Sequence, residues 1–242
     1  MKNLQGKIAV ITGGNSGIGY ATARALKECG AQVIITGRRK AAVDKAAKEL
    51  DVTGLIADQS KLNDIDTLVM DVTRQFGKVD ILLINAGITK LSPIELMQEH
   101  VFDEVMNVNF KGAYFTLSRF IPILEENASV ILLSSTSAHI SPPQGSVYAA
   151  SKAALNAVMK IAAVELASRK IRVNAVSPGP VATEIMEKIG LNLALEDNMV
   201  ASIPLARLGQ PIEIARLIAF LSSDDASFIT GSEYFVDGGQ SI

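Results

Sequence analysis

The sequence predicts an α/β protein built on one doubly wound parallel β-sheet with helices on both faces. Short β-rich runs alternate with longer helical patterns along the 242 residues. Most of the runs are continuous apolar stretches, which is typical of parallel strands buried on both faces. Strand–helix alternation favours right-handed crossovers. We expect about seven strands: Ile8–Thr12, Gln32–Thr36, Thr53–Ala57, Val79–Asn85, Ser129–Ser134, Arg172–Ser177 and Glu233–Val236.

The segments between the strands have helical spacing, as in "ATARALKEC" and "AAVDKAAKEL". Two longer helices are expected around Val101–Leu124 and Tyr148–Ser168. The second is apolar on more than one face, so one face either meets another subunit or is buried within the chain. We see no repeat or linker and predict one domain over residues 1–242, in which the weakly patterned segment 184–203 is a substrate lid.

Composition excludes several classes of protein. The chain is 48% hydrophobic with a net charge of −2, so no basic field attracts nucleic acid. Cys29 is the only cysteine, which fits a reducing compartment. We find no signal peptide and no run near the ~18 apolar residues of a membrane span. We expect a soluble cytoplasmic protein and no metal, because His100 has no ligand cluster near it.

The first strand runs into the glycine-rich turn "TGGNSGIG" at 12–19. Glycines let the backbone approach a ligand closely, and the helix that follows directs its positive end at a pyrophosphate. The turn therefore predicts a nucleotide site, although a turn without a ligand has the same glycines. The predicted contacts are Gly13, Asn15, Ser16, Gly17, Ile18 and Gly19.

The end of the second strand favours NADP over NAD. Gly37 occupies the place where an acidic residue binds the ribose of NAD, and no Asp or Glu lies between Glu28 and Asp44. Arg38 and Arg39 follow, and a guanidinium can bind a 2′-phosphate through charge-assisted hydrogen bonds of about 1.5–3 kcal/mol each. Arg38 is the stronger candidate. The alternative is that both side chains are simply solvated.

The run "YAASK" places Tyr148 and Lys152 one helical turn apart, with Cβ atoms roughly 5–6 Å from each other. The pair is either an acid–base device or an ordinary surface pair, and the spacing alone does not distinguish them.

Taken together, these motifs resemble the short-chain dehydrogenases/reductases over essentially the whole chain. The family's order is matched by the glycine turn, Asp58, "NAG" at 85–87, "NVN" at 107–109, "SS" at 134–135, "YAASK", "SPGPVAT" at 177–183 and "GSEYFVDGG" at 231–239. The resemblance implies a Rossmann-like NAD(P)-binding fold and an NAD(P)-dependent oxidoreductase acting on CH–OH groups, commonly assembled as a homotetramer.

The resemblance also implies cofactor contacts beyond the glycine turn. Asp58 would bind the adenine amino group. The ribose would pack on Asn85, Ala86 and Gly87, and the nicotinamide would meet Pro178, Gly179, Val181 and Thr183, with Tyr148 and Lys152 beside it.

The implied catalytic residues are Asn109, Ser135, Tyr148 and Lys152. Tyr148 would exchange the proton, and an ammonium about 5 Å away would lower its pKa by roughly two units. Ser135 would orient the substrate oxygen. Asn109 would disturb its helix and free a carbonyl for a water that links Lys152 to solvent. Taken alone, each of these four residues is equally consistent with a purely structural role.

The sequence says less about the substrate. The apolar lid favours a small apolar or aromatic ketone, and the predicted contacts are Ser135, Tyr148, His139, Gln144 and the adaptable Met186. The alternative is that the apolar residues of the lid pack on their own domain and contact no substrate.

Two other functions remain open. A 3-oxoacyl-[acyl-carrier-protein] reductase would need a basic rim for its acidic carrier. We rank it second, because "EE" at 125–126 and an acidic lid are only partly offset by Arg169, Lys170 and Arg172. A non-catalytic NADP-binding regulator is the third reading, although regulators usually lose the tyrosine or the lysine.

Overall fold

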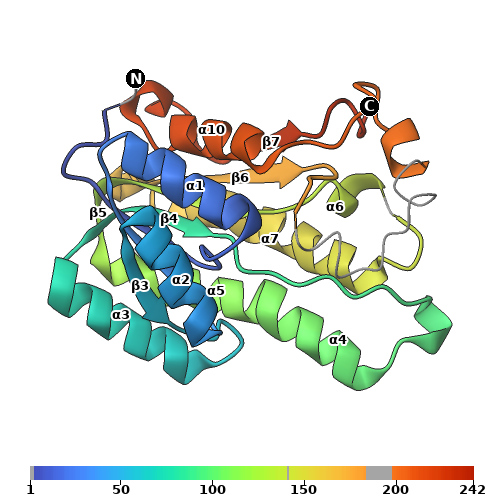
Figure 1. Cartoon of the computed structure of the whole chain (residues 1–242), viewed down its shortest axis with the longest axis horizontal. Helices are drawn as coiled ribbons and strands as arrows, with labels where there is room; N and C mark the ends of the chain where they lie inside the picture. The colour runs from blue at the N-terminus through green and yellow to red at the C-terminus, as the bar shows by residue number, and fades with distance from the viewer. Residues whose placement is uncertain (1–2, 141, 184–197) are drawn as a thin grey trace.

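A computed structural model describes residues 3–140, 142–183 and 198–242. A seven-stranded sheet in the order β3-β2-β1-β4-β5-β6-β7 crosses the molecule, and helices cover both of its faces (Figure 1). Every neighbouring pair of strands is parallel, which confirms the predicted Rossmann-like architecture. The strands are β1 Ile8–Ile11, β2 Gln32–Gly37, β3 Thr53–Ile56, β4 Val79–Ile84, β5 Leu124–Leu133, β6 Arg172–Pro178 and β7 Glu233–Val236.

Two separate cores hold the helices on the sheet. Alternate strand residues point to opposite faces, so Ile34 packs into one core and Ile35 into the other. The first core contains α3 (Leu62–Phe76), α5 (Ala113–Phe120) and α7 (Ser146–Glu165). The second contains α1 (Gly17–Glu28), α2 (Lys40–Leu50) and α10 (Pro211–Leu221).

The strand order reverses between β1 and β4, which places a crevice at their carboxyl ends. The glycine turn follows β1, and the run 85–87 follows β4 at the same edge. The end of β5 leads into the short helix α6 (Ser137–Ile140), which lies against α7. The fold thus gathers the predicted motifs at one edge of the sheet.

The helix expected over Val101–Leu124 is not continuous. It consists of α4 (Glu99–Met106), a π-helical segment over Asn107–Gly112, α5 and a 3₁₀ turn over Ile121–Ile123. A side chain at Gly112 would approach the carbonyl of Gln59, so the widened segment packs closely on the loop after β3. The predicted disturbance of the helix at Asn109 is confirmed.

The fifth strand begins at Leu124 rather than Ser129, because the chain is already extended after the proline-containing 3₁₀ turn and Leu124 pairs with Val79. Glu125 and Glu126 therefore belong to a strand, where they form ion pairs with Lys78 and Lys170. These charges lie at the amino end of the sheet. The prediction that Glu125 and Glu126 border the substrate entrance is therefore wrong. Arg169, Lys170 and Arg172 lie at the same end of the sheet, so they do not border the entrance either.

Among the described residues, α7 alone has the length and apolar composition of a membrane span, and 44% of that window is buried inside the molecule. Its buried side contributes Leu155, Met159 and Ala162 to the first core. We therefore interpret α7 as a core helix. Most of the predicted lid, including Met186, falls in 184–197, outside the described residues.

Candidate active site

The glycine turn is packed so closely that side chains would disrupt it. Gly13 and Gly17 have positive φ angles of 64° and 54°. A Cβ on Gly19 would lie 2.4 Å from the carbonyl oxygen of Gly13, and one on Gly13 would lie 2.9 Å from Cα of Ala86. The turn can therefore pack this closely on itself and on the run after β4 only because these positions are glycine.

Polar groups fix the turn to the end of β4. Nδ2 of Asn85 donates to the carbonyls of Thr12 (2.8 Å) and Gly13 (3.1 Å). The Thr12 hydroxyl accepts from the backbone N–H groups of Asn85 and Ala86, each at 3.0 Å. Asn85 was predicted to pack on ribose, and its visible role is to brace the turn. Thr12 was missed by the sequence analysis.

The amino end of α1 faces this turn with no side-chain cap from Ser16, its N-cap residue. The first N–H groups of a helix need acceptors, and the partial positive charge there favours an anion. Thr183 closes the other side, since its Cγ2 lies 3.3 Å from the place where Gly17 would carry a Cβ. The sequence prediction that a pyrophosphate binds at this turn is consistent with these unpaired groups.

The basic residues after β2 are exposed, as a phosphate contact requires. Within the described ranges neither Arg38 nor Arg39 forms an ion pair, and Arg39 is the N-cap residue of α2. A Cβ on Gly37 would lie 2.4 Å from Oδ1 of Asn15, so an acidic side chain does not fit at position 37 without displacing Asn15. The preference for NADP over NAD stays a prediction.

Tyr148 is half-buried near the carboxyl end of β5, and the hydroxyls of Ser135 and Thr89 lie close enough to affect its ionisation. Desolvation raises the pKa of Tyr148 above its usual value of 10.0, and the nearby hydroxyls of Ser135 and Thr89 only partly oppose this. The predicted lowering of the pKa by Lys152 is therefore wrong for the protein alone. Thr89 was also missed, because its place after "NAGI" carries no distinctive signal.

Lys152 lies beneath the tyrosine in the interior. Its ammonium donates to the carbonyl of Leu133 at 2.7 Å and lies 5.8 Å from the ring centroid of Tyr148. Burial lowers the pKa of Lys152 from 10.5 to about 8. The predicted one-turn pairing on α7 is confirmed, but the ammonium is bound by the end of β5.

Asn109 joins α4–α5 to the loop after β4. Its Oδ1 accepts from the N–H of Ile88 at 2.8 Å, and its Nδ2 donates to the Ile88 carbonyl at 2.9 Å and to the Ser151 hydroxyl at 3.2 Å. Ser151 in turn donates to the Tyr148 carbonyl at 2.7 Å. Asn109 thus holds the loop that carries Thr89 against the helix that carries Tyr148.

The run after β6 is held by β5 and β7. The carbonyl of Pro178 accepts from Thr136 N–H at 3.0 Å, and Gly179 N–H donates to the carbonyl of Val236 at 3.1 Å. Val181 is buried and bridges to Gly209. A cavity of about 110 Å³ borders this run on the side of α10.

Other predicted site residues lie further from the tyrosine cluster or face other partners. Oδ1 of Asp58 accepts from the N–H and hydroxyl of Ser60, and its adenine contact stays a prediction. The carbonyl of Gln144 accepts from Ser92 N–H at 2.9 Å. His139 contacts Glu233 at 2.8 Å rather than Ser135 or Tyr148.

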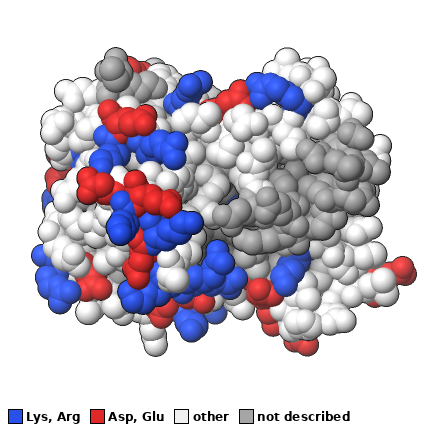
Figure 2. Space-filling model, in the orientation of Figure 1, with Lys and Arg blue, Asp and Glu red and all other residues white. Residues whose placement is uncertain are grey.

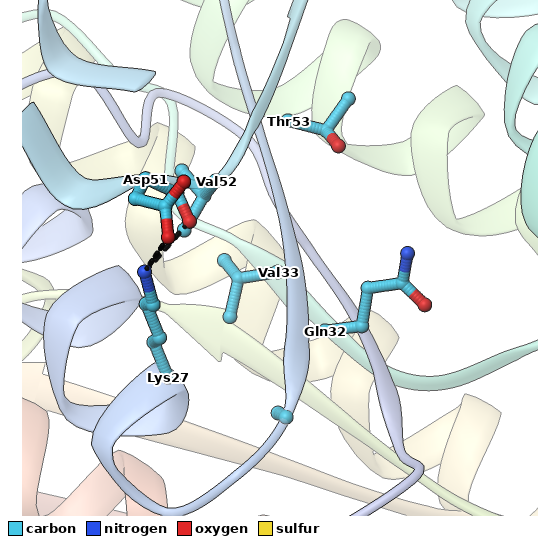
Figure 3. Close-up of a pocket in the computed structure, with 7 residues that line it drawn as sticks. Lys27, Gln32, Val33, Asp51, Val52 and Thr53 are labelled. Carbon is cyan, nitrogen blue, oxygen red and sulfur yellow. Dashed lines mark hydrogen bonds and ion pairs between the residues drawn. The ribbon is translucent and has the colours of Figure 1, made fainter. Parts of the chain in front are cut away.

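A second, larger cavity of about 320 Å³ lies away from these residues, at the amino ends of β2 and β3 (Figure 3). The Lys27 ammonium points to Asp51 there and donates to its carboxylate at 2.8 Å and to the Leu50 carbonyl at 2.7 Å. This contact stabilises the carboxyl end of α2. None of the predicted site residues lines the cavity, so we do not assign the reaction to it.

Comparison with known proteins agrees with this arrangement. A family profile described as Enoyl-(Acyl carrier protein) reductase matches residues 13–241. The 3-oxoacyl-[acyl-carrier-protein] reductase FabG of Thermotoga maritima is 37% identical, over 98% of both chains.

Two solved structures are similar over nearly the whole chain. The 3-ketoacyl-(acyl-carrier-protein) reductase of Brucella melitensis, complexed with NADH, has a TM-score of 0.94 and 37% identity, covering 99% of this chain and 100% of its own. A blue fluorescent protein from a metagenomic library, in complex with NADPH, has a TM-score of 0.93 and 28% identity, with both chains covered completely (100%).

Proposed function

Because the chain belongs to the short-chain dehydrogenase/reductase family, an NAD(P)-dependent group of oxidoreductases, we propose that it is an NADPH-dependent carbonyl reductase that converts a small, apolar or aromatic ketone to a secondary alcohol. The observation that carries this proposal is the placement of the Tyr148 hydroxyl with Ser135 and Thr89 at the sheet edge where the glycine turn opens.

The protein residues divide the work of binding and proton transfer. The nicotinamide cofactor, when bound, supplies the hydride. The glycine turn and the amino end of α1 would hold its pyrophosphate, and Arg38 its 2′-phosphate. The residues of the chain then need only orient the ketone and deliver one proton to its oxygen.

Tyr148 is the proposed proton donor. Its raised pKa keeps the hydroxyl protonated at neutral pH, which is the state that ketone reduction consumes. Ser135 would donate a hydrogen bond to the same ketone oxygen and fix its orientation. Lys152, with a pKa of about 8, would return a proton to the phenolate after each turnover, with Asn109 holding the loop around it.

Reduction of a 3-oxoacyl group on an acyl carrier protein is the second candidate, and the names of the similar proteins favour it. The surface in Figure 2 argues the other way. Lys and Arg lie among Asp and Glu mainly over α1, α2 and α3, and the described residues on the rest of that face form no broad basic patch. Among those residues, an acidic carrier would find no broad basic surface to bind.

A panel of carbonyl compounds tests both candidates. Free aliphatic and aromatic ketones are compared with a carrier-linked 3-oxoacyl group, using NADPH and NADH at matched concentrations, and product chirality is then determined. We expect faster turnover of free ketones with NADPH. Much faster turnover of the carrier-linked group would establish the second candidate, and NADPH binding without turnover of any carbonyl would support a regulator.

We also propose that the chain assembles as a homotetramer in the cytoplasm. Apolar side chains are exposed on α4 and α5 at Phe102 and Tyr114, and on α7 at Ile161 and Val164. Exposed apolar side chains on neighbouring long helices are typical of a subunit interface. Light scattering that gives the mass of one chain would contradict the tetramer.

A further inference from the structure

A single carboxylate connects three segments around the site. Glu233 is the first residue of β7, and its side chain is only 12% exposed. Its Oε1 accepts from Nδ2 of Asn156 at 2.9 Å and from the hydroxyl of Ser177, and Nε2 of His139 lies 2.8 Å away. All three contacts converge on one oxygen atom.

The three partners come from the segments that carry the site. His139 is the third residue of α6, which begins two residues after Ser135. Asn156 lies on α7, one turn after Lys152. Ser177 lies in β6, directly before the run that begins at Pro178. Figure 1 shows α6 beside the carboxyl end of β6 and near α7.

The residue before α6 is held separately, since Thr136 donates its N–H to the Pro178 carbonyl at 3.0 Å and its hydroxyl to Oε1 of Gln240 at 3.3 Å. The amides of Ala138, His139 and Ile140 bond only to the carbonyls of Ser135 and Thr136, inside the same short segment. A four-residue helix is too short to be stable by itself. Among the described residues, the contact between His139 and Glu233 links α6 itself to β7, together with an edge-on contact of His139 to Phe235 at 5.0 Å between ring centroids.

We propose that Glu233 is a positioning residue that holds Ser135 in register with Tyr148. It touches no reacting atom in this arrangement and acts through His139 and Asn156. A hydrogen bond to an ionised carboxylate is stronger than one to a neutral acceptor, and a displacement of about 1 Å at a reacting group can lower a rate about 100-fold. This role rests on the proposed reduction and extends it.

Two substitutions of Glu233 separate its shape from its hydrogen bonds. Glu233→Gln keeps an oxygen that can accept from all three partners, whereas Glu233→Leu fills similar space without an acceptor. Asp80→Asn and Asp80→Leu are the matched controls. Asp80 is 16% exposed, binds Lys7 and the N–H of Ile8, and lies at the opposite end of the sheet.

Amide hydrogen exchange and steady-state kinetics are measured on all four variants. For Glu233→Leu we expect exchange in residues 134–140 about tenfold faster than in the wild type, and kcat about 10- to 100-fold lower with an unchanged KM for NADPH. Glu233→Gln should stay within about threefold of the wild type in both measurements. The Asp80 variants should exchange faster only near the starts of β1 and β4, with kcat unchanged.

Unchanged exchange at 134–140 in Glu233→Leu would overturn the proposal, as would an equal loss of kcat in Asp80→Leu. If Glu233→Leu does not fold, His139→Leu, which removes the partner of Glu233 on α6, decides in the same way: faster exchange at 134–140 supports the role, and wild-type exchange refutes it. Amide hydrogen exchange does not depend on turnover. If the wild type reduces no ketone, the proposed function is disproved, and the exchange data still decide whether Glu233 positions residues 134–140.

Discussion

The side-chain amide of Asn109 satisfies both backbone groups of Ile88, accepting from its N–H at 2.8 Å and donating to its carbonyl at 2.9 Å. Asn109 is fully buried and lies in the π-helical segment between α4 and α5. A residue 21 positions earlier in the chain is therefore held by a contact that mimics a backbone pair. This contact fixes the loop after β4 at the site.

Asn109→Leu should destabilise the protein strongly. It leaves the part-buried N–H and carbonyl of Ile88 without their partner, and each such group costs up to about 1–3 kcal/mol when water cannot replace the lost hydrogen bond. We expect the free energy of unfolding to fall by ~2–5 kcal/mol in urea denaturation. Asn63→Leu, at an exposed position of α3, is the control. An equal loss of unfolding free energy in both variants would contradict the contact between Asn109 and Ile88.

Tyr148→Phe should abolish reduction and leave the fold intact. The ring still packs, but the proton donor is gone, and general acid catalysis typically contributes about 10²–10⁴-fold. We expect ketone-dependent NADPH oxidation to fall by that factor while the Kd of NADPH, from cofactor fluorescence, stays within about threefold. Tyr114→Phe, a change on the exposed face of α5, should be fully active. Equal rates in Tyr148→Phe and the wild type would exclude the proposed role.

The sheet and the motifs could be predicted because their signals are local. Buried parallel strands appear as continuous apolar runs, and the ends of β1, β4 and β5 must share one edge once the strands are parallel. The predicted start of β7 at Glu233 also matches the structure, although β7 is a partly exposed edge strand. The fifth strand was misplaced because the polar run before Ser129 has no apolar signal, although the chain there is extended.

The partners of the site residues could not be predicted, because they depend on contacts between distant segments. Nothing in the sequence links Asn109 to Ile88, or Glu233 to His139, 94 residues apart. The pKa of Tyr148 is a similar case. The spacing to Lys152 suggested a lowered pKa for Tyr148, yet desolvation prevails and raises it, and the ammonium of Lys152 is bound to the carbonyl of Leu133.

Arg38→Ala should weaken selectivity for NADPH. The loss of a guanidinium from the 2′-phosphate removes about 1.5–3 kcal/mol, so the ratio of kcat/KM for NADPH to that for NADH should fall about 10- to 100-fold. The kcat/KM for NADH should be unchanged. Arg39→Ala, which removes the neighbouring exposed guanidinium, should have a smaller effect. If Arg38→Ala leaves the ratio of kcat/KM for NADPH to that for NADH unaltered, Arg38 does not bind the 2′-phosphate.

The buried ammonium of Lys152 should make stability rise with pH. Its pKa is about 8 in the folded protein against 10.5 for the free group, so between these values the unfolded chain binds more protons and the free energy of unfolding increases with pH. The penalty is full below pH 8 and is relieved as the pH approaches 10.5. From pH 7 to 9.5 the unfolding free energy of the wild type should rise by ~2 kcal/mol relative to Lys152→Met, which lacks the titrating group.

Urea denaturation of both proteins across this pH range measures the difference. Lys160→Met, on the exposed side of the same helix, is the control and should show the same increase in unfolding free energy with pH as the wild type. If Lys152→Met also shows this increase, the ammonium of Lys152 is not desolvated in the folded protein.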